Sequence, residues 1–127
     1  MKAYLEQLVT LPGVAALCVH RGPNIIWKRL PADFSAESAE ALCQAVYDGF
    51  FAYASAERFL TEAYFGFSGQ SVLAIAKPPA QPGEAASYFL SFLLTDPAAA
   101  ATVSKTAAAV LAEQPELKNP LPHLRRR

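Results

Sequence analysis

Residues 35–54, SAESAEALCQAVYDGFFAYA, decide the fold of this chain. Polar side chains recur there at spacings of three and four, which predicts one long helix with Ser35 as its N-cap and Glu37 near the positive end of the helix dipole. The polar stripe is narrow and consists of Glu37, Glu40, Gln44 and Asp48. Nearly every other position is apolar or small, whereas an ordinary surface helix buries only one stripe. We therefore expect one side of this helix to cover the core and another side to contact a second protein surface.

The segments around this helix predict two further helices and two groups of strands. In chain order, the expected elements are a helix over 2–11, strands over 14–20 and 25–30, the long helix, strands over 58–67, 71–76 and 87–94, and a helix over 97–112. Short turns join the neighbouring strands, which is typical of antiparallel hairpins. The order α-β-β-α-β-β-β-α therefore predicts an α+β fold, with an antiparallel five-stranded sheet that carries helices on both faces.

The length and composition predict a single domain over residues 1–113, followed by a proline-containing basic tail over 114–127 that we expect to be flexible. The proline-rich segment 77–85 is expected to be a loop. Without the arginines at 125–127, the chain has 8 basic and 11 acidic residues, a balance that argues against nucleic acid as a partner. The start of the chain is too polar for a signal peptide and no run is long enough to span a membrane, so we expect a cytoplasmic protein without a membrane partner.

The residues that could carry chemistry do not form a recognisable catalytic or metal-binding pattern. Cys18 and Cys43 lack metal-ligand and CxxC spacing, and we expect buried, reduced thiols. His20 lies on the same strand face as Cys18, but a nucleophile and base also need an orienting third group. The acidic stripe of the long helix is interpreted as a solvated face. We therefore expect no catalytic residue, no cofactor and no metal, although a small hydrolase that uses Cys18 or Cys43 remains an alternative.

The opening of the chain resembles the roadblock family of dynein light chains and their bacterial relatives. In that family a short helix ends in a leucine-x-x-x-proline-glycine-valine phrase, which stands here at residues 8–14, and Gly22 marks the hairpin turn that follows. The order of helices and strands also agrees with the family over residues 1–112. The resemblance implies a roadblock-like sandwich and a non-enzymatic role as a platform or regulator of small Ras-like GTPases, or as an adaptor in motor and signalling complexes.

The resemblance also implies a homodimer in which the second helices pack together and the third strands pair edge to edge. The apolar second side of the long helix and the open, proline-free strand 58–67 independently favour such an association. The candidate interface residues are Leu42, Val46, Tyr47, Gly49, Phe50, Tyr53, Glu62 and Tyr64. A small-molecule sensing domain, with a pocket between sheet and helix, is the main alternative function, although the sequence identifies no convergent polar groups for it.

Overall fold

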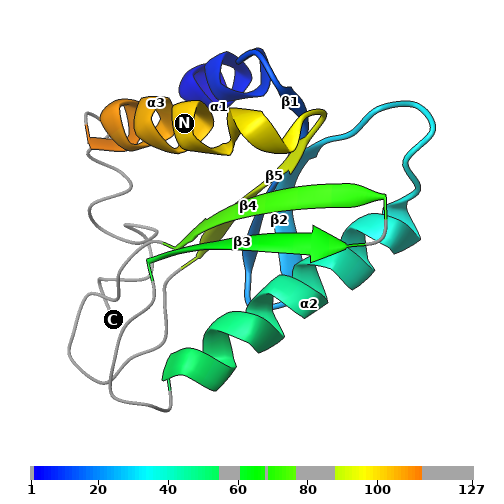
Figure 1. Cartoon of the computed structure of the whole chain (residues 1–127). Coiled ribbons are helices and arrows are strands. Elements are labelled where there is room, and N and C mark those ends of the chain that lie inside the picture. Colours follow the sequence, from blue (N-terminus) through cyan, green and yellow to red (C-terminus); the bar gives the residue numbers. More distant parts are fainter. Residues whose placement is uncertain (1, 55–60, 68, 77–87, 113–127) are drawn as a thin grey trace, which may run out of the picture.

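The computed structural model describes residues 2–54, 61–67, 69–76 and 88–112, and it forms a five-stranded antiparallel sheet with helices on both faces (Figure 1). The elements are α1 (Lys2–Val9), β1 (Val14–Arg21), β2 (Asn24–Arg29), α2 (Ala36–Ala54), β3 (Glu62–Phe67), β4 (Gln70–Ala76), β5 (Phe89–Leu94), the 3₁₀ turn η1 (Pro97–Ala99) and α3 (Ala100–Ala112). The predicted α+β architecture and its order of elements are confirmed.

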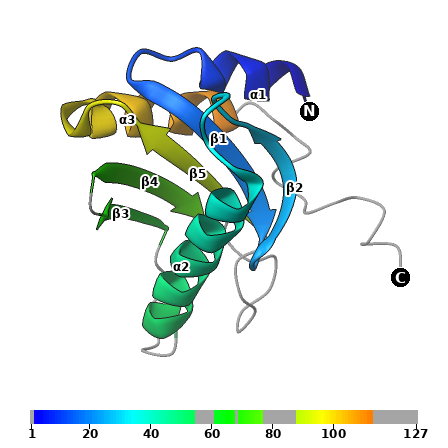
Figure 2. The same cartoon turned by 90° about the vertical axis from the view of Figure 1, so that its right-hand side faces the viewer.

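The sheet has the strand order β2-β1-β5-β4-β3, and every neighbouring pair is antiparallel. The last strand in the sequence, β5, therefore lies at the centre, and its side chains are buried on both faces, as its continuous apolar sequence predicts. Strands β2 and β3 form the two edges. Helices α1 and α3 cover one face of the sheet and α2 covers the other (Figures 1 and 2).

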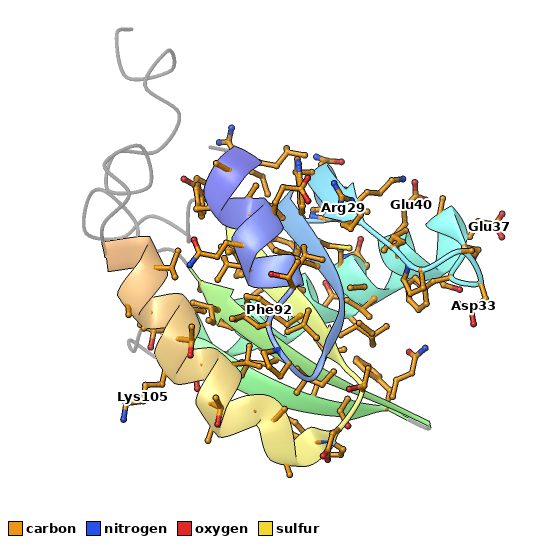
Figure 3. All side chains as sticks on the ribbon, turned by 90° about the horizontal axis from the view of Figure 1, so that it is seen from above. Arg29, Asp33, Glu37, Glu40, Phe92 and Lys105 are labelled. Carbon is orange, nitrogen blue, oxygen red and sulfur yellow. The ribbon has the colours of Figure 1, made fainter. Side chains whose placement is uncertain are left out.

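Alternate residues of the strands divide the core between the two faces. The face under α1 and α3 holds the larger cluster, which includes Leu5, Leu8, Leu17, Phe92 and Val103. The α2 face holds a second cluster that includes Val46, Phe50, Val72, Ala74 and Phe89. Figure 3 shows Phe92 in the space between the sheet and the helices on the α1/α3 side. The alternation follows from the period of two in a strand, which directs successive side chains to opposite faces.

Local signals in the sequence define the start of α2. The Ser35 Oγ accepts a hydrogen bond from the Ser38 backbone N–H at 3.0 Å, so the predicted N-cap is confirmed. Four fully or nearly buried positions, at spacings of four, three and four, then form the line of the helix that faces the sheet; they are Ala39, Cys43, Val46 and Phe50. The other side chains of residues 36–52 are half-buried or exposed in the single chain.

The start of the last helix is likewise defined by its capping residues. The Asp96 carboxylate accepts a hydrogen bond from the Ala98 backbone N–H at 3.0 Å, and Pro97 takes the first position of the turn. The first turn is 3₁₀ rather than α-helical, and the α-helix proper begins at Ala100. Short 3₁₀ turns are common where a helix begins.

Some predictions differ from the structure or lie outside the described residues. The first helix ends at Val9 rather than at residue 11, because the Thr10 hydroxyl and backbone N–H both donate to the Gln7 carbonyl and close the helix. The strand predicted over 58–67 is observed as Glu62–Phe67, and residues 58–60 lie outside the described residues. The loop at 77–85 and the tail at 114–127 lie outside them as well. Of the helices described, none combines the length and the apolarity that crossing a membrane requires.

Gly13 connects α1 to β1 and provides the first testable prediction. Its φ is +90°, and a Cβ built there would lie 2.4 Å from the Cβ of Ala99. Replacing Gly13 with Ala should therefore combine backbone strain with a steric clash and lower the free energy of unfolding by about 2 kcal/mol or more in a urea titration. Gly69→Ala is the matched control, because Gly69 also has a positive φ, +77°, but an added Cβ would meet no atom within 4 Å. An equal loss in both variants would exclude the contact with Ala99 as the cause.

Candidate functional site

One candidate site is the edge of the sheet at β3, which pairs with β4 on one side only. Its side chains alternate between the two faces of the sheet. Glu62 and Tyr64 lie on the α3 face, where the Glu62 carboxylate accepts a hydrogen bond from the Ser104 hydroxyl at 2.6 Å. Phe65 points to the α2 face, with its ring centroid 6.3 Å from that of Phe50. Tyr64 is 48% exposed and Phe67 is 36% exposed, so this edge presents aromatic side chains to the solvent of the single chain.

The side of α2 next to β3 is built from small residues. A Cβ built at Gly49 would lie 2.9 Å from the Phe65 ring, so only glycine allows the helix to approach β3 this closely. Ala45 and Ala41 continue the same i, i+4 row toward the start of the helix; the first is half-buried and the second is exposed. The open edge of β3 and the small-residue side of α2 are therefore neighbouring parts of one surface.

The structure separates the eight candidate interface residues into two groups. Val46 and Phe50, at 0% and 5% exposure, pack under the sheet against Val72 and Phe89, so their side chains belong to the core and leave no surface for a partner. The periodicity of the helix alone could not show which of its apolar sides faces the sheet. The remaining candidates are half-buried or exposed, except Tyr53, whose side chain lies outside the described residues; they are Leu42, Tyr47, Gly49, Glu62 and Tyr64.

The aromatic residues of α2 mark its other side. Tyr47 packs against Gly22 in the β1–β2 turn, and its ring is edge-on to Phe89 at a centroid distance of 6.2 Å. Phe51, one turn further along the same side, is 61% exposed and lies 6.0 Å from the Tyr47 ring. Phe51 is the most exposed of the large apolar side chains that the structure describes. It therefore extends the helix surface on the side of β1 and β2, away from β3.

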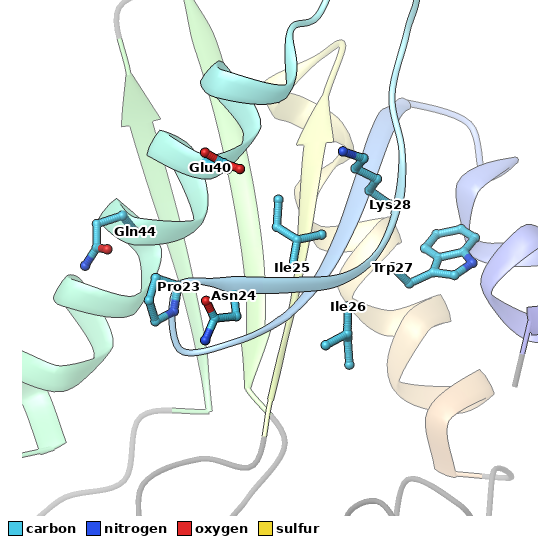
Figure 4. A pocket seen from close by; sticks show the side chains of 8 residues that line it. All are labelled: Pro23, Asn24, Ile25, Ile26, Trp27, Lys28, Glu40 and Gln44. Atoms are coloured by element: carbon cyan, nitrogen blue, oxygen red, sulfur yellow. The ribbon is translucent and has the colours of Figure 1, made fainter.

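An open groove with a volume of about 630 Å³ lies between β2 and α2 (Figure 4). Its lining includes polar side chains from both elements: Asn24, Lys28, Glu40 and Gln44. No pattern in the sequence indicates this group, because Lys28 and Glu40 belong to different elements and only the packing of α2 under the β1–β2 hairpin brings them to one groove. Three apolar side chains of the hairpin, Ile25, Ile26 and Trp27, complete its β2 side together with Pro23.

His20 is fully buried and has a structural role. Its Nδ1 lies 2.7 Å from the Gly22 carbonyl and its Nε2 lies 2.8 Å from the Ser91 hydroxyl, while its ring stacks on Phe89. Because a carbonyl only accepts, Nδ1–H donates to Gly22, and the neutral ring accepts the Ser91 proton at Nε2. Burial lowers the pKa of His20, and the hydrogen bond to Gly22 opposes this only in part. Ser91 is 2% exposed, so no substrate reaches this serine–histidine pair in the structure.

The two cysteines are free and buried, at 4% exposure for Cys18 and none for Cys43. This burial gives no support to a hydrolase that uses either thiol as its nucleophile. Within residues 2–54, 61–67, 69–76 and 88–112, no group of three or more His, Cys, Asp or Glu side chains could hold a metal ion.

Comparison with known proteins identifies the fold. No protein-family model matches the sequence, and no curated protein matches it. Among solved structures, the chain is similar to MglB in a tetrameric arrangement, with 13% identity and a TM-score of 0.63 over 87% of this chain and 84% of that one. It is also similar to a Roadblock/LC7 domain from Streptomyces avermitilis, with 14% identity and a TM-score of 0.61 over 94% and 92% of the two chains. The chain therefore has the roadblock fold, as its sequence motifs and order of elements imply.

The buried histidine leads to a prediction about pH. The folded chain holds the pKa of His20 below its ordinary value near 6.5, so the unfolded chain binds a proton that the folded chain does not. The free energy of unfolding is therefore unaffected by His20 above about pH 6.5 and decreases as the pH falls from there through the folded pKa. We expect the melting temperature to fall more steeply between pH 7 and 5 in the natural chain than in His20→Gln. Parallel pH profiles of the two proteins would contradict a buried neutral histidine.

Proposed function

We propose that this chain is a non-enzymatic, homodimeric regulatory or scaffold protein that acts in the cytoplasm and engages a small Ras-like GTPase, or a signalling or motor complex, through the α2 face. The roadblock fold supports the class, because the resemblance to that family implies platforms and regulators of this kind. One observation of the chain itself carries the proposal: the open β3 edge lies beside the small-residue side of α2.

The two edges of the sheet differ in a way that favours association at β3. Strand β2 has a bulge in its pairing with β1, and Arg29 on it forms an ion pair with Glu6 of α1 and lies 5.6 Å from the centroid of the Trp27 ring. Bulges and charged side chains are features that keep an edge strand from pairing with another chain. Strand β3 pairs with β4 in a regular register from Glu62 to Phe67 without a bulge, and its one charged side chain, Glu62, lies at the first residue of the strand. We therefore expect a second strand to pair at the β3 edge rather than at the β2 edge.

In the proposed dimer, two β3 strands pair about a two-fold axis and join the two sheets into one. The two α2 helices then meet on the same side, where the small side chains of Ala41 and Ala45 allow their backbones to approach closely. This arrangement leaves the opposite side of α2, with the 61% exposed Phe51, available for a further partner. Exposed aromatic residues of this kind often carry a large part of the binding energy at protein interfaces.

A small-molecule sensing role is a second candidate, which the groove between β2 and α2 favours. Lys28 and Glu40 supply one charge of each sign, and Asn24 and Gln44 supply amides. A pocket with a few placed polar groups is the usual form of a ligand site. A compound that raises the melting temperature of the natural chain but not of a Lys28→Ala/Glu40→Ala variant would favour this role over the scaffold role.

The dimer is testable by light scattering at low micromolar concentration. We expect a mass near twice that of the 13.7 kDa chain. Ala41→Glu and Tyr64→Asp should each weaken the dimer by about tenfold or more. In a two-fold dimer each chain contributes one copy of the new charge, so two like charges are buried in the same interface. Both positions are exposed in the single chain, so neither change should affect folding.

Ile26→Asp is the control, because Ile26 is 42% exposed on the other edge strand, β2, and the change there should leave the mass unchanged. A monomeric natural chain, or a dimer that only Ile26→Asp disrupts, would contradict the proposed interface.

The proposed partner is testable with purified small Ras-like GTPases from the same genome, each loaded with GDP or with a non-hydrolysable GTP analogue. We expect the chain to bind at least one of them, with a preference for one nucleotide state, and Phe51→Asp to weaken that binding by about tenfold. Single-turnover GTP hydrolysis, with and without the chain, then distinguishes a regulator from a scaffold. Absence of binding across the panel in both nucleotide states would overturn the GTPase part of the proposal and leave the dimer to be judged by its mass.

A further inference from the structure

Two cysteines that are 25 positions apart in the sequence meet beneath the β2 edge of the sheet. Cys18 comes from β1 and Cys43 from α2, and both pack with Ala39 in one small buried cluster. The two thiols lie close enough for each to shift the pKa of the other. Both cysteines are free. The cluster therefore brings together two reduced thiols from separate elements, β1 and α2.

The groove between β2 and α2 leads toward this pair. Ile25 lines the groove, where Figure 4 shows its side chain, and it also packs against the cysteine cluster. Lys28 and Glu40, which line the same groove, lie close enough to act electrostatically on Cys18 and Cys43, respectively. The adjacent Ile26 points away from Ile25 and is 42% exposed. Because Ile25 borders both, we take displacement of its side chain as the route by which a small solute reaches the thiols.

The surroundings of the pair make the two thiols unequal. The hydrogen bond from Cys43 holds the pKa of Cys18 below its usual value, against the effect of burial, and the Lys28 ammonium acts in the same direction. The hydrogen bond to Cys18, together with burial and the nearby Glu40 carboxylate, raises the pKa of Cys43. Since the thiolate is the reactive form, Cys18 is the thiol prepared to react first, with Cys43 beside it as the resolving thiol.

We propose that Cys18 and Cys43 form a reversible intramolecular disulfide between β1 and α2 when a peroxide enters through the groove past Ile25. Both thiols belong to one buried cluster, so the bond needs local adjustment of the two side chains and no unfolding of β1 or α2. This site is independent of the proposed dimer and its partner, so its failure would leave that function untouched.

The reaction balances with hydrogen peroxide as the oxidant. The Cys18 thiolate attacks one peroxide oxygen, so that an S–O bond forms, the O–O bond breaks and hydroxide leaves to become water. The Cys43 sulfur, after losing its proton, then attacks the Cys18 sulfenic acid; the S–S bond forms, the S–O bond breaks and a second water leaves. The two thiols lose two electrons and two protons to one peroxide, and a dithiol reductant reverses the change.

The disulfide would tie the N-terminal half of α2 to the centre of β1. It would close a loop of about 25 residues that contains β2 and the connection into α2, and constraining such a loop in the unfolded chain normally stabilises the fold. We therefore expect the oxidised chain to melt several degrees higher than the reduced chain.

The first test treats the folded, reduced chain with hydrogen peroxide, then unfolds it in denaturant with an alkylating reagent and measures the intact mass. For the natural chain we expect a mass loss of about 2 Da and no alkylation, and dithiothreitol should reverse both results. For Cys18→Ser and Cys43→Ser we expect one alkylated thiol after the short exposure that completes oxidation of the natural chain. Two alkylated thiols in the treated natural chain would overturn the proposal. Oxygen added to single cysteines, or a disulfide that only joins two chains, would overturn it as well.

The second test concerns the route. Ile25→Ala should speed the oxidation several-fold, whereas Ile26→Ala, the matched change at the next residue, should not. Val103→Ala is the control for stability, because Val103 is 1% exposed in the core on the opposite face and its truncation destabilises the fold without opening the groove. If Val103→Ala speeds the oxidation as much as Ile25→Ala does, the thiols react through unfolding of the chain and the groove is not the route.

Discussion

The burial of β5 on both of its faces is the constraint on which the rest of the structure depends. This strand pairs with β1 on one side and β4 on the other, and it carries Phe92 to the α1/α3 face and Phe89 to the α2 face. Neither ring can reach water, so each face needs its own helical cover. Because β5 lies between the hairpins β1–β2 and β3–β4, the sheet has β2 and β3 as its edges.

Helix α2 illustrates how one amphipathic element can serve several surfaces. Its buried line, from Ala39 to Phe50, covers the sheet. The Gly49 side approaches β3 closely, and the side of Tyr47 and Phe51 follows the β1–β2 hairpin. A sheet covers only one side of a helix that packs on it, so the other sides of α2 face the solvent or another surface. The apolar excess of the helix is therefore divided among the core, an open sheet edge and an exposed aromatic side chain, and only the first of these is satisfied within one chain.

Buried polar groups in this core are paired within it. His20 uses both ring nitrogens, one with the Gly22 carbonyl and one with Ser91, and Cys18 and Cys43 use each other. Among the described residues, every buried side-chain nitrogen and oxygen has a hydrogen-bond partner. Such pairing is expected, because an unpaired polar group in a dry core costs about 1–3 kcal/mol. All four of these side chains lie on the α2 face of β1 and β5 or on α2 itself, so this face combines the polar part of the core with the surfaces that we propose to be functional.

The sequence by itself determined the elements and their order, because capping, periodicity and turn residues act over a few positions. Ser35 caps α2 as predicted, Asp96 caps the last helix, and Glu62 and Phe65 lie on opposite faces of β3, as the period of two in a strand requires. Only the tertiary structure decided which apolar side of α2 faces the sheet, so Val46 and Phe50 could not be assigned to the core beforehand. It alone brought Cys18 to Cys43 and Lys28 to Glu40. The physical reason is that each of these contacts joins elements distant in the chain, and their packing depends on the complementary shapes of both partners rather than on any local pattern.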